Sequence, residues 1–209
     1  MPQPAILKIS EIFPSLQGEG LRMGEPTIFV RLTGCNLRCP FCDTKYAWDK
    51  GQDYAEDQIL TAVMKIRNKH HIDWVCLTGG EPLKQKIEHL VTSLRKAGLK
   101  VQLETNGTIH RRVGIDWLTI SPKPPEYFFR AEYATKAKEV KLVLTRDLTL
   151  NTIRNIRQAF PGRTPILLQP QSNLNWSVNL GNRLLRQAMK IGLRNIRLSI
   201  QLHKILNLR

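Results

Sequence analysis

The sequence predicts an α/β protein built as an incomplete or compressed parallel (β/α) barrel, with an open twisted sheet as the alternative. Runs rich in Val, Ile and Leu alternate along the chain with helical patterns. These runs lack a clean apolar–polar alternation, which is typical of strands buried on both faces of a parallel sheet. The chain has 209 residues, fewer than the roughly 250 of a complete eight-stranded barrel. At this length we expect one domain over residues 1–209.

The apolar runs are the expected strands, and the segments with a helical apolar period are the expected helices. The strands cover residues 27–32, 73–77, 100–104, 117–120, 139–144, 165–168 and 195–200. The helices cover residues 53–70, 83–97, 147–160 and 177–191. Asp53, with Glu56 three residues later, has the spacing of a capping box at the start of the first helix. Gly98 stops the second helix, and Asp147 caps the third.

The charge of the chain is strongly basic and unevenly distributed. Lys and Arg number 32 against 17 acidic residues, which gives a formal net charge of +15. The segment 148–209 contains no acidic residue, and its ten basic residues are Arg154, Arg157, Arg163, Arg183, Arg186, Lys190, Arg194, Arg197, Lys204 and Arg209. Such a surface binds nucleic acid, attracts small anions or is simply solvated. Since the spacing is scattered and aromatic residues are few, we expect a solvated surface and no nucleic acid required for activity.

Targeting signals are not expected in this sequence. No stretch approaches the roughly 18 consecutive apolar residues of a membrane span, so no membrane partner is expected. Residues 1–13 lack a basic start followed by an apolar run, which argues against a secretory signal. We therefore expect a cytoplasmic protein, in which thiols stay reduced. The four cysteines are then candidate metal ligands or core residues rather than disulfide partners.

A loop with three cysteines carries the first chemical signal. Cys35, Cys39 and Cys42 have the spacing C-x3-C-x2-C and directly follow the strand expected at 27–32. Thiolates are soft ligands that select zinc, Cu(I) or iron–sulfur clusters. A structural zinc site needs four protein ligands, but Cys76 lies inside an apolar run and is expected in the core. Three thiolates on a four-iron cube leave one iron open, as catalytic metal sites do.

This loop, with Phe41 before its last cysteine, resembles the signature of the radical S-adenosylmethionine (SAM) enzymes. The resemblance implies a barrel of the radical SAM type and a [4Fe-4S] cluster on Cys35, Cys39 and Cys42, whose open iron chelates SAM. One-electron reduction, by a donor such as flavodoxin or ferredoxin, then cleaves SAM to a 5′-deoxyadenosyl radical. Thr78-Gly79-Gly80-Glu81-Pro82, at the next strand end, resembles the element that binds the SAM amino group. The implied SAM-binding residues are Phe41, Gly80, Glu81, Ser121, Pro122, Lys123 and Gln169.

A narrower resemblance covers nearly the whole chain. The run 12–20, IFPSLQGEG, and the later run 201–204, QLHK, resemble the 7-carboxy-7-deazaguanine synthase family. The resemblance implies a lyase that contracts the ring of 6-carboxy-5,6,7,8-tetrahydropterin to 7-carboxy-7-deazaguanine with loss of ammonia, on the way to queuosine. It also implies a homodimer and a need for Mg²⁺. Gln171 and Leu202 depart from the pattern, since an acidic residue and a threonine are common there.

The residue types in these motifs suit the implied substrate. Gln17 and Glu19 offer acceptors to the N–H donors of a pterin edge, and Arg31 can hold a carboxylate bidentately. The Thr44 hydroxyl suits Mg²⁺, although a loop-capping hydroxyl explains it equally well. The implied substrate-binding residues are Leu16, Gln17, Gly18, Glu19, Arg31, Thr78, His203 and Arg209.

Two other functions fit parts of the sequence. One is a radical SAM activase that places a glycyl radical on a protein partner. Such activases share the cysteine loop, but this function does not explain the runs 12–20 and 201–204. The other is a metal-binding module without catalysis, docked on RNA through the basic segment. Iron content separates them cheaply, because a protein with the cluster is brown and holds about four irons, whereas a zinc module is colourless.

Overall fold

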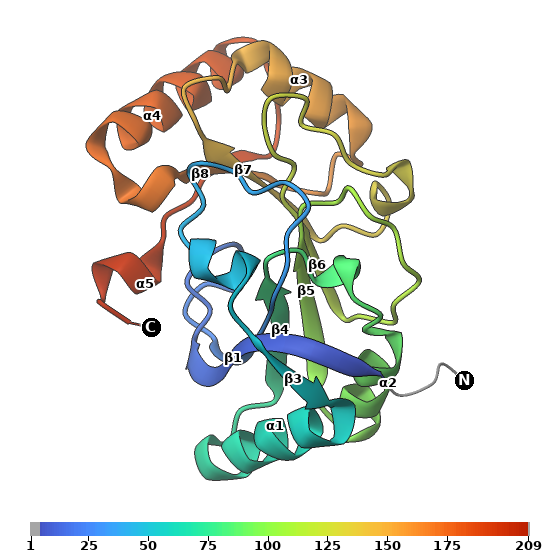
Figure 1. Cartoon of the computed structure of the whole chain (residues 1–209). Helices are drawn as coiled ribbons and strands as arrows, with labels where there is room; N and C mark the ends of the chain where they lie inside the picture. The colour runs from blue at the N-terminus through green and yellow to red at the C-terminus, as the bar shows by residue number, and fades with distance from the viewer. Residues whose placement is uncertain (1–4, 209) are drawn as a thin grey trace. The chain divides into compact units, whose positions relative to one another are not determined.

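The computed structural model describes residues 5–208 (Figure 1), and its contacts divide them into two compact units. The first unit contains the residues up to Leu16 together with Glu25–Thr105 and Ile109–Leu118. The second unit contains Gln17–Gly24, Asn106–Thr108 and the residues from Thr119 on. The single domain expected over residues 1–209 stays a prediction.

The first unit is built on a five-stranded mixed sheet. Its strands are β1 (Ile6–Leu16), β2 (Pro26–Leu32), β3 (Gln52–Ala55), β4 (Trp74–Gly79) and β5 (Lys100–Thr105), in the order β3-β1-β2-β4-β5. Its helices are α1 (Glu56–His70) and α2 (Glu88–Lys96), with 3₁₀ turns η1 (Lys45–Trp48) and η2 (Pro82–Lys84). β1 runs antiparallel to β2 and β3, whereas β2, β4 and β5 are parallel. α1 packs on β1, β2 and β3, and α2 packs on β5.

The second unit carries a parallel sheet. Its strands are β6 (Trp117–Ile120, which begins in the first unit), β7 (Glu139–Leu144), β8 (Ile166–Pro170) and β9 (Ile196–Leu198), adjacent in that order. Its helices are α3 (Leu150–Ala159), α4 (Asn175–Lys190) and α5 (Leu202–Ile205), with 3₁₀ turns η3 (Ala131–Tyr133) and η4 (Gln171–Asn173). α4, drawn in orange in Figure 1, packs on β7, β8, β9 and α3.

Burial explains why the strands lack alternation. All five residues of β8 and five of the six in β7 are buried, so both faces of these strands are covered. This confirms the expectation drawn from the Val/Ile/Leu-rich runs. All seven expected strands are present, with ends shifted by one or two residues in most of them.

Several local expectations were wrong. Asp53 does not cap α1, because it lies in β3 and pairs with Lys8; the Gln58 side chain accepts the Ala55 N–H instead. α3 is capped by Thr149, whose Oγ1 accepts from Thr152 N at 3.2 Å, and not by Asp147. α2 begins later than expected because Pro82–Lys84 forms a separate 3₁₀ turn.

Every described pair among the expected strands is parallel, but two antiparallel N-terminal strands, β1 and β3, were not expected. β1 is an antiparallel partner of β2 that the sequence analysis missed, because a bulge between Ile9 and Glu11 and polar residues interrupt its apolar pattern. Bulges of this kind shift the register by one residue, so that the period-two signal changes phase within one strand.

Candidate functional site

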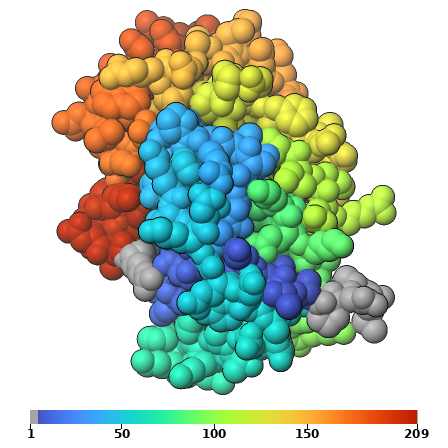
Figure 2. Space-filling view, viewed as in Figure 1, coloured from blue at the N-terminus to red at the C-terminus, as the bar shows by residue number. Residues whose placement is uncertain are grey.

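The cysteine loop, residues 34–44, directly follows β2 in the first unit. Cys35, Cys39 and Cys42 are all partly exposed, and no disulfide joins cysteines in the described part of the chain. The loop is held mainly by short-range bonds: Cys42 N donates to Cys39 O at 3.0 Å, and Leu37 N to Cys35 Sγ at 3.5 Å. In Figure 2 the blue segment around residues 25–45 lies on the surface that faces the viewer. Three accessible thiols on one short loop fit a soft metal centre.

The base of the cysteine loop rests on the glycine turn that ends β4. Gly80 N donates to Leu32 O at 3.0 Å, and Glu81 N donates to Gly34 O at 2.7 Å. A Cβ on Gly80 would lie 2.1 Å from Gly34 O, so no other residue allows this approach. The two motifs are therefore joined through their backbones.

The Glu81 side chain points into the protein. It is fully buried, and its Oε1 accepts from Leu83 N at 3.0 Å and from Thr105 Oγ1 at 2.7 Å. This carboxylate thus connects the ends of β4 and β5. Its backbone N–H supports the cysteine loop. This structural role is additional to the SAM contact that the resemblance implies for Glu81.

A row of polar residues crosses three neighbouring strands of the first unit. Glu11 on β1, Arg31 on β2 and Thr78 on β4 are register partners, so their side chains share one face of the sheet. Arg31 Nε donates to Glu11 Oε1 at 2.6 Å, and both side chains are about seven-eighths buried. Arg31 Nη1 and Nη2 donate to no group within residues 5–208. Glu11 therefore orients the guanidinium while its terminal edge stays available to an anion.

An apolar layer lies beside this row on the same face of the sheet. Phe13, Phe29 and Cys76 are register partners two residues away from this row on their strands, and they form one buried cluster. The two rings stack with centroids 5.3 Å apart, and Arg31 Cζ lies 5.8 Å from the Phe13 centroid. Cys76 is fully buried there, as expected for a core residue.

Tyr46 and Glu11 are functional candidates that the sequence analysis missed. Tyr46, on the 3₁₀ turn η1 after the cysteine loop, donates its hydroxyl to Glu11 Oε1 at 2.6 Å. The loop is thereby connected to the row that holds Arg31. The signal available in the sequence was weak, because Glu11 stands in a strand whose pattern the bulge obscures.

Thr44 lies at the end of the cysteine loop. Its Oγ1 is 3.5 Å from Cys42 Sγ, and its side chain makes no capping bond to η1. The capping role that was the alternative for this hydroxyl is therefore absent. Phe41, expected near the adenine of SAM, is partly exposed in the same loop.

The Glu19 loop, Gln17–Gly24, belongs to the second unit. Gln17 closes it, since Gln17 O accepts from Gly24 N at 2.8 Å and Gln17 Oε1 accepts from Glu19 N at 3.2 Å. Leu202 N donates to Gly18 O at 2.8 Å. A Cβ on Gly18 would lie 2.1 Å from His203 Nδ1, so the glycine lets His203 pack on the loop.

The Glu19 carboxylate is held at both oxygens. Oε2 pairs with Lys141 Nζ, and Oε1 accepts from Gln201 Nε2 at 2.6 Å. Burial raises the pKa of this carboxyl, but the charge and hydrogen bond of Lys141, the hydrogen bond of Gln201 and the charge of His203 outweigh burial and lower the pKa from 4.5 to about 2. Glu19 is therefore ionised and accepts hydrogen bonds throughout the neutral range.

β6, β7 and β8 present a buried polar face in the second unit. Thr119 Oγ1 donates to Glu139 Oε1 at 2.8 Å, and Ser121 Oγ donates to Lys141 O at 2.9 Å. Gln169 is 2% exposed, yet neither its Oε1 nor its Nε2 has a hydrogen-bond partner within residues 5–208. A buried amide with no partner is costly, and such groups mark places where a polar ligand binds.

The structure sorts the expected residues into two sets. In the first unit lie Leu16, Arg31, Cys35, Cys39, Phe41, Cys42, Thr44, Thr78, Gly80 and Glu81. In the second unit lie Gln17, Gly18, Glu19, Ser121, Pro122, Lys123, Gln169 and His203, with the Lys123 ammonium donating to Ser121 Oγ. Arg209 lies outside the described residues. The partners of Glu19 were missed, although two charged residues at alternate positions of a buried strand were a readable signal.

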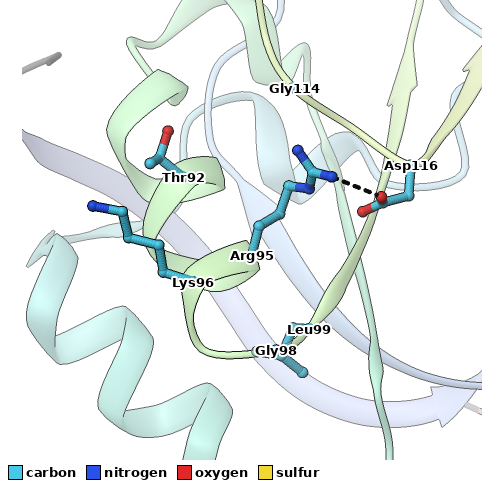
Figure 3. Close-up of a pocket in the computed structure, with 7 residues that line it drawn as sticks. All are labelled: Thr92, Arg95, Lys96, Gly98, Leu99, Gly114 and Asp116. Atoms are coloured by element: carbon cyan, nitrogen blue, oxygen red, sulfur yellow. Dashed lines mark hydrogen bonds and ion pairs between the residues drawn. The ribbon is translucent and has the colours of Figure 1, made fainter.

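A pocket of about 460 Å³ in the first unit is lined by none of these expected residues. It lies where α2 ends and β5 begins. Arg95 pairs with Asp116 at 3.2 Å, and Figure 3 shows this pair among the lining residues. Asp116 Oδ2 also accepts from Val101 N at 2.9 Å. The pocket is at the amino end of β5, whereas sites in this type of fold lie at the carboxyl ends of strands.

Comparison with known proteins finds close relatives over almost the full chain. The model of the radical SAM superfamily matches residues 29–175. Proteins named 7-carboxy-7-deazaguanine synthase from Rickettsia prowazekii and Bacteroides thetaiotaomicron are 34% and 36% identical to this chain. Each match covers 97% of this chain, and the two matches cover 88% and 98% of the relatives' lengths. The crystal structure of QueE from Escherichia coli matches with a TM-score of 0.78 at 28% identity, over 95% of each chain. SuiB from Streptococcus suis matches with a TM-score of 0.59 at 12% identity, over 80% of this chain and 48% of that chain, a likeness of fold alone.

Proposed function

Because the chain belongs to the radical SAM superfamily and, within it, to the 7-carboxy-7-deazaguanine synthase family, we propose that it contracts 6-carboxy-5,6,7,8-tetrahydropterin to 7-carboxy-7-deazaguanine with loss of ammonia. The observation that carries this proposal is identity of 34–36% to proteins of that name over 96–99% of this chain. The cysteine loop and the Glu19 loop supply residues of the types that this chemistry needs.

The cofactors are a [4Fe-4S] cluster and SAM, and the residues present fit both. Cys35, Cys39 and Cys42 are accessible thiols on one loop, with Cys76 buried away in the apolar layer. When bound, the cluster and SAM supply the radical that removes a hydrogen atom from C6 of the substrate. The orphaned amide of Gln169 fits a polar ligand such as SAM. Gly80, Glu81, Phe41, Ser121, Pro122 and Lys123 are the further SAM-binding candidates.

Arg31 binds the carboxylate of the substrate. Its Nε is held by Glu11, which leaves the two terminal nitrogens for a bidentate contact. The apolar layer beside Arg31 excludes water from one side of the guanidinium, and a low local dielectric strengthens its pairing with an anion. Thr78 is beside Arg31 in register and offers a hydroxyl to the same ligand.

The pterin ring binds to the Glu19 loop. An ionised carboxylate accepts hydrogen bonds and donates none, so Glu19 suits the ring N–H and amino donors of a pterin. His203, packed on Gly18, and the backbone of Leu16, Gln17 and Gly18 complete the proposed contacts, together with Arg209.

Mg²⁺, the electron donor and the assembly are proposed on the family resemblance. Thr44 would offer its hydroxyl to Mg²⁺, which takes hard oxygen ligands and keeps several waters. We propose a one-electron donor of the flavodoxin or ferredoxin type, a homodimer, and a cytoplasmic protein that needs no nucleic acid. Within residues 5–208, no helix is long and apolar enough to cross a membrane.

The decisive experiment is anaerobic turnover. Reconstituted protein is incubated with SAM, dithionite, Mg²⁺ and the carboxytetrahydropterin, and products are identified by mass spectrometry. We expect 7-carboxy-7-deazaguanine and ammonia in equal amounts. A protein that cleaves SAM but leaves the pterin unchanged, and instead radicalises a glycyl-radical partner, would contradict the proposal. So would a colourless, zinc-bound protein that takes up no iron.

A further inference from the structure

A buried lysine on β7 has no part in the reaction as described above. Lys141 is 7% exposed, and its ammonium pairs with Oε2 of Glu19. Gln201 donates to the other oxygen of the same carboxylate at 2.6 Å. A buried charge without a partner is strongly destabilising, so Lys141 and Glu19 each depend on the other.

We propose that Lys141 is a positioning residue of the substrate site, which keeps the Glu19 carboxylate oriented as a hydrogen-bond acceptor for the N–H donors of the pterin ring. This inference rests on the proposed function, since it assigns a task to a residue that touches Glu19 and not the substrate.

The register of β7 directs two of its charged side chains to the Glu19 loop. Glu139 and Lys141 are two residues apart and so lie on the same face of the strand. Glu139 is 1% exposed and accepts from Leu21 N at 2.7 Å. A Cβ on Gly20 would lie 2.4 Å from Glu139 Oε1, so the loop backbone packs directly on that carboxylate. β7 therefore holds the loop at its backbone through Glu139 and at the Glu19 side chain through Lys141.

The backbone of Lys141 is also fixed. Ser121 Oγ, at the end of β6, donates to Lys141 O at 2.9 Å. The long lysine side chain thus starts from a constrained point and is buried along most of its length. Such a side chain loses little further freedom when its ammonium meets a carboxylate, which favours a fixed geometry.

The charges around Glu19 explain why a lysine is needed. Lys141 and Glu139 face the loop from β7, and His203 faces it from α5. Burial raises the pKa of Glu19, and without the ammonium this effect would be opposed only by Gln201 and His203. A protonated Glu19 would present an O–H donor to ring donors, which is a mismatch. Removal of Lys141 therefore moves the pKa of Glu19 upward and weakens substrate binding as the pH falls.

The test compares Lys141→Met with Lys141→Arg and with a matched control, Lys138→Met. Lys138 is an exposed lysine three residues earlier. Its substitution changes the net charge by the same amount without removing the ion pair of Glu19. For Lys141→Met we expect KM for the carboxytetrahydropterin to rise about tenfold to a hundredfold, with a smaller change in kcat. We also expect an acidic limb in the pH profile of kcat/KM that the wild type lacks. Lys141→Arg should restore part of the loss, and the control should match the wild type.

A double-mutant cycle separates positioning from general stability. In a Glu19→Gln background, Lys141→Met should raise KM no further, because Lys141 acts through the Glu19 carboxylate. Iron content should be unchanged in every variant. If the two substitutions multiply their effects, or if Lys141→Met keeps the wild-type KM and pH profile, the inference is overturned. If the wild type itself makes no 7-carboxy-7-deazaguanine, the proposed function fails instead.

Discussion

The cysteine loop and the Glu19 loop prepare their binding groups in opposite ways. The cysteine loop places three proposed cluster ligands within eight residues, partly exposed and held mainly by short-range bonds. The Glu19 loop presents one carboxylate, whose two partners come from 122 and 182 residues away in the sequence. A site made of a short motif depends on its ligands alone, whereas a site made of distant partners depends on the whole fold around it.

This difference reflects what each group must do. A metal cluster organises its own ligands, because metal–thiolate bonds are strong and directional. A carboxylate that recognises a ring edge has no such help, so the protein must fix its direction and its charge beforehand. The buried partners of Glu19 supply that fixation, whereas the cysteine loop is supported at its backbone and leaves its thiols partly exposed.

The largest expected effect is loss of the cluster from the cysteine loop. Cys35→Ala, Cys39→Ala and Cys42→Ala should each abolish iron binding and turnover, since each removes one of three protein ligands. Iron analysis and the visible absorption of the cluster check this. The matched control is Cys76→Ala, which should keep its iron and lose only about 1 kcal/mol of stability for the atom removed from the core. Loss of iron in Cys76→Ala with the fold intact would mean that the ligand set is wrong.

Substitution of Arg31 tests a binding group that lies on a strand and, like Glu19, is held by a partner side chain. Arg31→Lys should raise KM for the substrate about tenfold or more, because a bidentate contact becomes a point charge. Steady-state kinetics measure it, while SAM cleavage without substrate should persist. Arg95→Lys is the matched control, since Arg95 makes an exposed pair with Asp116 elsewhere in the first unit. An equal loss of SAM binding in Arg31→Lys would place this arginine in the cofactor site.

A smaller effect is expected at Thr44, which belongs to the cysteine loop and is proposed to bind Mg²⁺. Thr44→Ala should raise the Mg²⁺ concentration needed for half-maximal turnover, by about tenfold if one ligand hydroxyl is lost. Thr44→Ser, which keeps the hydroxyl, should behave as the wild type does. Identical Mg²⁺ titrations for the alanine and serine variants would remove Thr44 from the metal site.

The smallest effect is expected from the basic surface. Eight of the ten basic residues in segment 148–209 are exposed, and Arg157 is buried against the carbonyls of Phe160, Pro161 and Thr164. Binding of tRNA should be weak and disappear by about 0.2 M salt, and tRNA should not change turnover. Filter binding across a salt series measures this. Tight binding at that salt, or faster turnover with tRNA, would assign the surface a function.

Local signals in the sequence predicted much of this protein. The cysteine spacing, the glycine turn and the buried strands each depend on neighbours within a few residues, and all are found where expected. The partners of Glu19 and Arg31 could not be predicted the same way. Lys141 and Glu11 meet them only through sheet register and chain return, and these are set by the tertiary fold. The polar composition of β1 and β3 likewise hid strands that are stabilised by pairing.

The bulge between Ile9 and Glu11 makes β1 sensitive to the insertion or deletion of single residues. It sets which of its residues share a face, so that Phe13 meets Phe29 and Glu11 meets Arg31. Deleting Ser10 would remove the extra residue and move either Leu7 and Ile9 or Glu11 and Phe13 to the opposite face of the sheet. Substitutions that keep polarity should be tolerated along this strand, whereas single-residue insertions and deletions should not. In a deep insertion–deletion scan, β1 would therefore stand out as a strand whose spacing matters more than its composition.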